Sequence, residues 1–181
     1  MDVQIDLLST PEDIEQIIEL QTRCLRVINS QDYTPRQIES LVTSQKSARF
    51  GNEIIVVAKY DQKIVGFACL SVSAPIIGGL YVAPDFCRRG IGSNLLAEIE
   101  NIAIEKKYKN LYVNSSVTAV AFYQRNSYKK LVNLGFYAVP KVWVEAFLMN
   151  KELIPQTNLE KALPILLFVF LFLVLVISII R

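Results

Sequence analysis

The stretch YVAPDFCRRGIGSNLL, residues 81–96, constrains the fold more than any other part of the sequence. An apolar, strand-like run passes through a proline and a Gly-x-Gly turn into a run of helix formers, which predicts a strand–turn–helix unit. The glycines let backbone N–H groups approach a ligand closely, and the N–H groups at a helix start favour phosphate oxygens. Arg88 and Arg89 indicate that the ligand is negatively charged.

Hydrophobic periodicity predicts further strands and helices on both sides of this unit. Strands are expected at residues 3–8, 53–60, 63–72, 77–82, 111–114, 128–137 and 142–149. Helices are expected at residues 93–107 and 117–125, and after Thr10 and Thr34, each of which is an N-cap followed by a proline. Hairpins followed by two β-α-β crossovers predict an α/β (α+β) fold with one mixed sheet and helices on both faces. Trp143 is expected in the core.

Charge and residue usage argue against several classes of protein. The chain has 19 basic and 17 acidic residues, and a net charge of +2 lacks the basic excess of a nucleic-acid-binding protein. Histidine is absent, which removes the commonest metal ligand and the commonest general base, so no metal site is expected. Three widely spaced cysteines, Cys24, Cys69 and Cys87, favour a reducing compartment over a disulfide framework.

The C-terminal region differs from the rest of the chain. Residues 162–180 form a run of 19 residues without a charge, flanked by Lys161 and Arg181. As a helix this run would be about 28 Å long, close to the roughly 30 Å hydrocarbon core of a bilayer. We expect a transmembrane helix at 162–180, a linker at 154–161 and a globular domain at 1–153. With no secretory signal at the N-terminus, this predicts a single-pass, tail-anchored membrane protein whose domain is cytosolic.

Three kinds of phosphate-containing ligand bind at turns of this type. A Walker A loop is excluded, because no Gly-Lys-Ser/Thr follows the turn. A dinucleotide fingerprint requires a third Gly or Ala where Leu95 stands, and an acid about 20 residues on, where the sequence reads Asn110, Leu111, Tyr112. The third kind of ligand is the diphosphate of coenzyme A.

The residues around the turn resemble those of GNAT superfamily N-acetyltransferases. The family pattern Gln/Arg-x-x-Gly-x-Gly/Ala aligns on Gly90 and Gly92, with Cys87 in place of the first residue. The resemblance implies that backbone amides at residues 88–93 cradle the diphosphate of acetyl-CoA, while the backbone at 80–82 pairs with the pantetheine arm. The implied cofactor-binding residues are Leu80, Tyr81, Val82, Arg88, Arg89, Gly90, Ile91, Gly92, Ser93, Ser116 and Ala119.

A second motif supports the resemblance. The family has Asn-x-x-Ala-x-x-Phe/Leu-Tyr at the start of the next helix, and this chain reads SVTAVAFY from Ser116 to Tyr123. Ser116 replaces the Asn, and Ser127 replaces a Gly that relatives often carry after the helix. The resemblance covers residues 3–153 and implies a GNAT-like, mostly antiparallel sheet of six to seven strands.

The chemistry that the resemblance implies is acetyl transfer from a thioester to a primary amine. In the family, the tyrosine that matches Tyr123 lies near the sulfur and protonates the leaving thiolate; a phenol with a pKa near 10 stays protonated at neutral pH. Tyr128 is the alternative acid. Some relatives carry a Glu on the strand before the turn, but residues 75–79 contain no carboxylate, so water is the expected proton acceptor. The oxyanion is expected to contact the Val82 N–H.

Several residues leave alternatives open. Asp32 and Tyr33 lie where relatives shape the acceptor site, and Glu145 is a similar candidate. Cys87 is by default a small side chain, but its place at a helix start favours the thiolate and leaves a redox role open. The sequence thus predicts a membrane-tethered, acetyl-CoA-dependent N-acetyltransferase with an unidentified amine acceptor. The alternative is a non-catalytic acetyl-CoA-binding or interaction module on the same fold.

Overall fold

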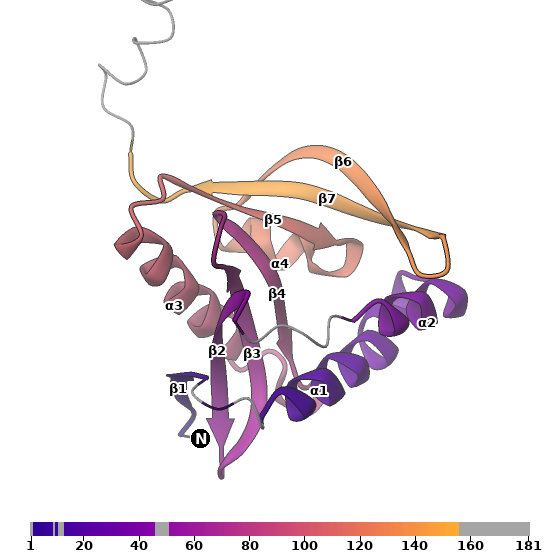
Figure 1. The fold of residues 1–181 in the computed structure, drawn as a ribbon, viewed down its shortest axis with the longest axis horizontal. Coiled ribbons are helices and arrows are strands. Elements are labelled where there is room, and N and C mark those ends of the chain that lie inside the picture. Colours follow the sequence, from indigo (N-terminus) through magenta and orange to yellow (C-terminus); the bar gives the residue numbers. More distant parts are fainter. Residues whose placement is uncertain (1, 9, 11–12, 46–50, 156–181) are drawn as a thin grey trace, which may run out of the picture.

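Figure 1 shows the computed structural model, which describes residues 2–8, 10, 13–45 and 51–155. The strands are β1 (Gln4–Leu7), β2 (Glu53–Tyr60), β3 (Lys63–Ser71), β4 (Ile76–Val82), β5 (Asn110–Ser116), β6 (Lys129–Ala138) and β7 (Val142–Glu152). The helices are α1 (Ile14–Val27), α2 (Pro35–Thr43), α3 (Ile91–Glu105) and α4 (Val120–Arg125), with short 3-10 helices η2 (Asn29–Gln31), η3 (Pro84–Phe86) and η4 (Val117–Ala119). Apart from the 3-10 helices, this element order is the predicted one.

The seven strands form one sheet in the order β1-β2-β3-β4-β5-β7-β6. Neighbouring strands are antiparallel except for β4 and β5, which pair in parallel through the α3 crossover. A second crossover, through α4, takes the chain from β5 past the position of β7 to β6 at the end of the sheet. The prediction of a mixed, mostly antiparallel sheet is confirmed.

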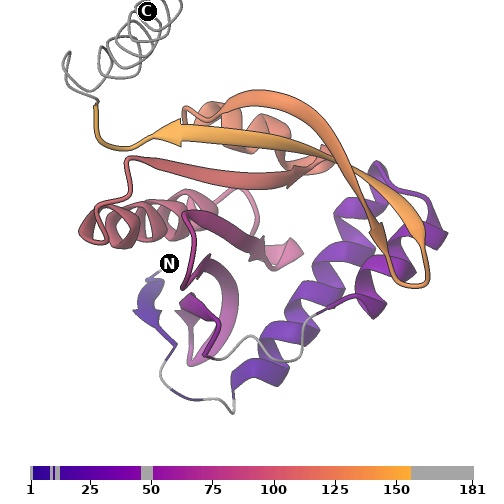
Figure 2. The same cartoon turned by 45° about the horizontal axis from the view of Figure 1, so that its top comes forward.

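Helices cover both faces of the sheet. Val56 of β2 packs in one buried cluster with Leu95 of α3, whereas its neighbour Val57 packs in another cluster with Ile17 of α1. Because successive residues of a strand point to opposite faces, α3 and α1 lie on opposite sides of β2. Figure 2 shows this layering, with α1 and α2 on one side of the sheet and α3 on the other.

Local sequence signals explain two of the boundaries. Thr34 caps α2 as predicted, because its side chain accepts a hydrogen bond from the Gln37 N–H and Pro35 follows it in the first turn. The β2–β3 hairpin turns through Asp61 and Gln62, whose positive φ values of 47° and 63° fit a two-residue type I′ turn.

Some predictions concern residues outside the described part of the chain. The helix start after Thr10 includes residues 11 and 12, which are not described, and α1 begins at Ile14. The predicted transmembrane helix at 162–180 and most of the linker lie in 156–181, which are not described either. Among the residues that the structure does describe, no helix has the length and apolar character needed to cross a bilayer.

The expectation that Trp143 is a core residue is wrong. Trp143 is 50% exposed on β7. Its ring lies across Gly135 of the neighbouring strand β6, where an added Cβ would come within 2.1 Å of Trp143 Cζ2. Trp143 points to the face opposite its neighbour Val144, which packs with Ile38 of α2 in a buried cluster. On that outer face Gly135 gives the ring a flat surface to lie on.

Candidate active site

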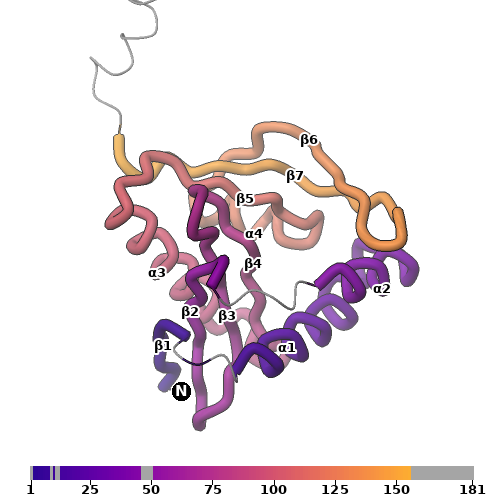
Figure 3. Tube along the Cα trace, in the orientation of Figure 1, coloured from indigo at the N-terminus to yellow at the C-terminus, as the bar shows by residue number. Residues whose placement is uncertain are grey.

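The cavity that contains most of the predicted site opens where β4 and β5 separate. These strands pair only at Ile76 with Tyr112 and at Ile77 with Val113, and beyond that point they diverge (Figure 3). A cavity of about 730 Å³ lies there, lined by both strands, the start of α3, α4, and the end of α1. Because the strands separate, backbone groups on their inner edges can bind a ligand instead of each other.

The inner edge of β4 directs backbone groups into this cavity. The Ala83 N–H donates to Val65 O of β3 at 2.8 Å. In an antiparallel ladder successive residues point their backbone groups to alternate sides, so Val82 and Leu80 direct theirs away from β3 and towards β5. Leu80, Tyr81 and Val82 all line the cavity, which places this edge where an extended ligand can add to the sheet.

The Gly-x-Gly turn presents further donors to the same cavity. Gly90 caps α3 with a φ of 83°, and Arg88 before it has a φ of 59°, so the chain reverses sharply into the helix. The first hydrogen bond of the helix runs from the Asn94 N–H to Gly90 O at 3.0 Å, which leaves the N–H groups of residues 91–93 without an intrahelical acceptor. Arg88, Gly90, Gly92 and Ser93 line the cavity.

Gly92 lies in close contact with residues of α4 and β4. An added Cβ at Gly92 would lie 3.3 Å from Phe122 Cε2 of α4 and 3.7 Å from Leu80 Cδ2.

Two of the predicted binding residues, Arg89 and Ile91, do not line the cavity. Ile91 is 3% exposed and packs in the core under α3, and the Arg89 guanidinium lies 5.5 Å from the centre of the Phe86 ring.

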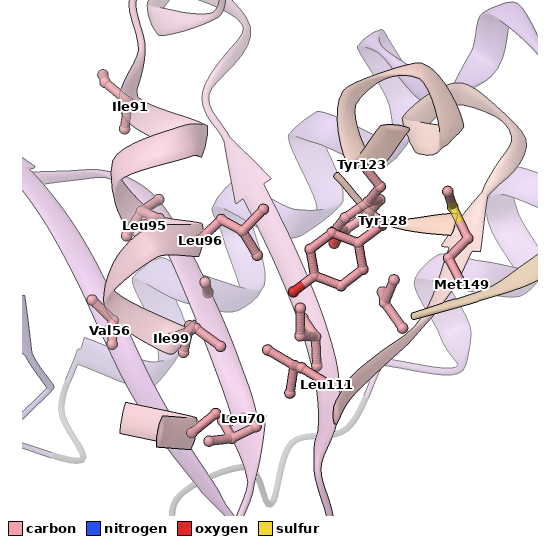
Figure 4. Packing of buried hydrophobic residues seen from close by; sticks show 14 of the residues in the cluster. Val56, Leu70, Ile91, Leu95, Leu96, Ile99, Leu111, Tyr123, Tyr128 and Met149 are labelled. Atoms are coloured by element: carbon pink, nitrogen blue, oxygen red, sulfur yellow. The ribbon is translucent and has the colours of Figure 1, made fainter. Parts of the chain in front are cut away.

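Tyr123 faces the cavity from α4 and is almost fully buried. It is 4% exposed, and its ring contacts those of Phe122 and Tyr128 edge-on, at centroid distances of 5.1 and 5.3 Å. Figure 4 shows Tyr123 and Tyr128 side by side above the core. Burial raises the pKa of Tyr123 well above its ordinary value, with smaller contributions from Tyr81 and Cys69, so the hydroxyl stays protonated at neutral pH. Tyr128 does not line the cavity.

Ser116 and Ala119, the other positions of the second motif, also line the cavity. The nearby turn keeps its shape although Ser127 stands where relatives often have glycine. Ser127 adopts a φ of 71°, and its N–H donates to Gln124 O at 3.0 Å, so the serine takes the left-handed conformation that a glycine favours.

Tyr33 joins three parts of the chain at the side of the cavity. Its hydroxyl donates to Glu145 O of β7 at 2.7 Å and accepts from the Val117 N–H of η4 at 2.9 Å. Tyr33 and Glu145 line the cavity, whereas Asp32 does not. The Tyr33 side chain, 6% exposed, is therefore a structural tie between β7 and η4.

The charged residues around the cavity are unevenly distributed. Within the described part of the chain, two basic residues line the cavity: Arg88, just before α3, and Arg125, the last residue of α4. In the same part of the chain, Glu145 is the acidic lining residue. The two arginines attract an anion to the part of the cavity that α3 and α4 line. The described residues contain no group of three or more acidic, cysteine or histidine side chains placed to hold a metal ion.

The prediction that Cys87 favours its thiolate is wrong. Burial raises the pKa of the Cys87 thiol, and the nearby Arg88 offsets this only in part. The Sγ atom points to backbone carbonyls, at 3.5 Å from Val82 O and 3.5 Å from Ala83 O, rather than to the N–H groups of the helix start. Cys87 lies before the turn, three residues short of the N-cap Gly90, and does not gain the charge stabilisation expected at a helix start.

Sequence reasoning did not find several lining residues. They include Asn29, Asn114, Arg125, Asn126 and Phe136. Arg125 and Asn126 follow Tyr123 within one helical turn at the end of α4, so their place at the cavity could have been predicted from the motif. Asn29 and Phe136 come from η2 and β6, and only the folded topology brings them to the cavity.

The site combines a split sheet, a glycine turn at a helix start and a protonated tyrosine beside that turn. This is the arrangement of a transferase that binds a phosphate-containing carrier. The family model for the acetyltransferase (GNAT) domain matches residues 29–152. The chain therefore belongs to the GNAT acetyltransferase family and is an acyltransferase.

Individual relatives agree with this family. The chain is 29% identical over 122 residues to the uncharacterized N-acetyltransferase YafP of Escherichia coli, a match that covers 66% of this chain and 77% of the relative. The fold of this chain is similar to that of a GCN5-related N-acetyltransferase from Rhodopseudomonas palustris. The TM-score is 0.78 and the identity is 23%, with coverage of 84% of this chain and 96% of the other. It is also similar to PaiA N-acetyltransferase from Thermoplasma acidophilum, solved with coenzyme A, with a TM-score of 0.64, 24% identity, and coverage of 84% and 99%.

Proposed function

We propose that the protein transfers the acetyl group of acetyl-CoA to a primary amine and that residues 162–180 tether it to a membrane. One observation carries the catalytic part of the proposal. The N–H donors of the Gly-x-Gly turn, the inner edge of β4 and the protonated Tyr123 all line a single cavity. A thioester carrier needs these three features in one place: an anion cradle, a strand edge and an acid.

The residues present fit this co-substrate. The cavity volume of about 730 Å³ suits a ligand of coenzyme size, and Gly92 keeps the floor of the turn free of a side chain. The turn N–H groups and Arg88 would hold the diphosphate, and Leu80 and Val82 would pair with the amides of the pantetheine arm. PaiA N-acetyltransferase, which shares the fold, was solved with coenzyme A.

The chemistry follows from where the donors lie. The neutral acceptor amine attacks the thioester carbonyl, and the backbone N–H of Val82 stabilises the oxyanion that forms. The C–S bond then breaks, and Tyr123 donates its proton to the departing sulfur. Water removes the proton from the amine nitrogen. An amine with a pKa of about 10.4 is neutral only about once in 10³ at pH 7, so catalysis should quicken as pH rises towards that value.

A release assay tests the catalytic proposal. Free coenzyme A thiol is followed with acetyl-CoA and a panel of polyamines, lysine peptides, peptide N-termini and small primary amines, against a control without amine. We expect amine-dependent release that needs an intact Tyr123. Binding of acetyl-CoA without release on any amine would favour the non-catalytic module instead.

The tether rests on the sequence of residues 162–180. We expect the full chain to stay with membranes after extraction at alkaline pH, and a chain ending at residue 158 to be released. Recovery of the full chain in the released fraction would overturn the tether without affecting the catalytic proposal.

A further inference from the structure

We propose that lysines around the end of β7 bind anionic lipid headgroups and hold the domain against the bilayer in one orientation. The three exposed lysines Lys106, Lys107 and Lys129 form what we call the basic collar. This inference rests on the tether of the proposed function and goes beyond it, because a tether alone leaves the domain free to turn.

The collar surrounds the place where the described chain ends. β7 lies between β5 and β6 in the sheet, so its last residues have a neighbour on each side. On one side, Lys109 O accepts hydrogen bonds from the Leu153 N–H at 2.8 Å and the Ile154 N–H at 3.3 Å. On the other, Lys129 stands opposite Asn150. Figures 1 and 2 both show the turn between α3 and β5 beside the end of β7.

Positive charge predominates at this end of the domain. Lys106 and Lys107 close α3, and Lys109 follows just before β5. The exposed acids on the same segments are Glu105 and Glu152. Lys109, Lys130 and Lys151 are not counted in the collar, because each has another interaction. Lys151 donates to Glu100 at 2.7 Å, and Lys130 Nζ lies 3.5 Å from the centre of the Phe147 ring.

Large apolar side chains are exposed next to the collar. Ile104, two residues before Lys106, is 42% exposed, and Leu131, two residues after Lys129, is 53% exposed. Lysines interspersed with exposed apolar side chains are typical of surfaces that lie in the headgroup region of a bilayer.

The length of the following chain selects a bilayer as the partner. Only six residues, 156–161, separate the last described residue from the apolar run, and fully extended they span about 20 Å. The linker therefore lets the collar lie at any distance up to about 20 Å from the bilayer, including within one Debye length of about 8 Å at physiological salt. Within that length juxtamembrane lysines are attracted to anionic lipids.

Lysine footprinting on the full chain tests the proposal. The protein is reconstituted in nanodiscs of phosphatidylcholine, with or without 30% phosphatidylserine as the chosen probe, and labelled with a membrane-impermeant amine reagent. We expect labelling of the collar lysines to fall about threefold or more with phosphatidylserine, and to recover in 0.5 M salt. Lys63 is the internal control, because it is exposed at the β2–β3 hairpin, at the opposite end of the domain (Figure 1).

A double variant, Lys107→Gln and Lys129→Gln, should lose the phosphatidylserine-dependent protection of Lys106, whereas Lys63→Gln should retain it. Both variants should keep wild-type acetyl transfer in detergent, since neither change touches the cavity. Uniform labelling of a disc-bound chain would overturn the collar alone. Protection that persists in detergent would mean a contact between copies and would also overturn it. A chain absent from the disc fraction would overturn both tether and collar.

Discussion

Replacing Tyr123 by phenylalanine removes the proposed acid and almost nothing else. The ring is 4% exposed and keeps its edge-on contacts with Phe122 and Tyr128, at 5.1 and 5.3 Å. General acid catalysis contributes about 10²- to 10⁴-fold to rate, and each tenfold corresponds to about 1.36 kcal/mol. Tyr123→Phe should therefore raise the barrier by about 3 to 5 kcal/mol.

The assay is release of free coenzyme A thiol at saturating amine, with acetyl-CoA binding measured separately. We expect kcat to fall by about 100-fold or more while the Kd for acetyl-CoA changes less than about threefold, because the turn residues proposed to bind the diphosphate are unchanged. Tyr128→Phe is the matched control, since Tyr128 is equally buried but does not line the cavity. A Tyr123→Phe enzyme with wild-type kcat, or a Tyr128→Phe enzyme with the larger loss, would refute the assignment.

The raised pKa of Tyr123 has a separate consequence for stability. The folded state keeps the proton to higher pH than the unfolded chain, whose tyrosines titrate near 10. The folded state therefore binds more protons above pH of about 10, and the free energy of unfolding should fall as pH rises past that value. Tyr123→Phe should weaken this fall in denaturant titrations at pH 9 to 11.

Three further predictions concern stability and reactivity. Ser127→Gly should raise the free energy of unfolding by about 0.5 to 1 kcal/mol in urea titrations, because a left-handed φ strains serine more than glycine; a loss of stability would contradict this. Tyr33→Phe should lower the free energy of unfolding by about 1 to 3 kcal/mol, since it leaves Glu145 O and the Val117 N–H without their partner; no change would show that water replaces the hydroxyl. Alkylation of Cys87 should be slow at pH 7, quicken above the ordinary thiol pKa of 9.0, and be blocked by coenzyme A, because its pKa is raised and it lines the cavity; fast alkylation at pH 7 would contradict this.

The order of strands and helices could be predicted from the sequence because local signals set it. The continuous β-rich runs of β2 and β3, the Thr34 cap and the glycines at positions 90 and 92 act within a few residues. The positions of the turn and of Tyr123 also follow from short motifs. Their meeting in one cavity depends on β4 and β5 separating after only two paired positions, which no local pattern specifies.

Predictions failed where the environment came from distant segments. The thiolate expected at Cys87 depends on what buries the sulfur, and the expected core position of Trp143 depends on which face of β7 the helix α2 covers. Tyr33 was expected near the acceptor site, and it lines the cavity. Its two hydrogen bonds could not be predicted, because their partners Glu145 and Val117 lie 112 and 84 positions further along the chain. Such contacts are fixed by topology rather than by neighbouring residues.

Calorimetry with coenzyme A and with pantetheine, which lacks the diphosphate, tests the central claim most directly. Two charge-assisted hydrogen bonds from the turn, at about 1.5 kcal/mol or more each, predict at least about 100-fold tighter binding of coenzyme A. Ser93→Pro removes one turn N–H in the first helical turn, where proline is tolerated, and should weaken coenzyme A about tenfold while leaving pantetheine unchanged. Equal affinity for the two ligands, or an equal loss for both in Ser93→Pro, would contradict an anion cradle at residues 88–93.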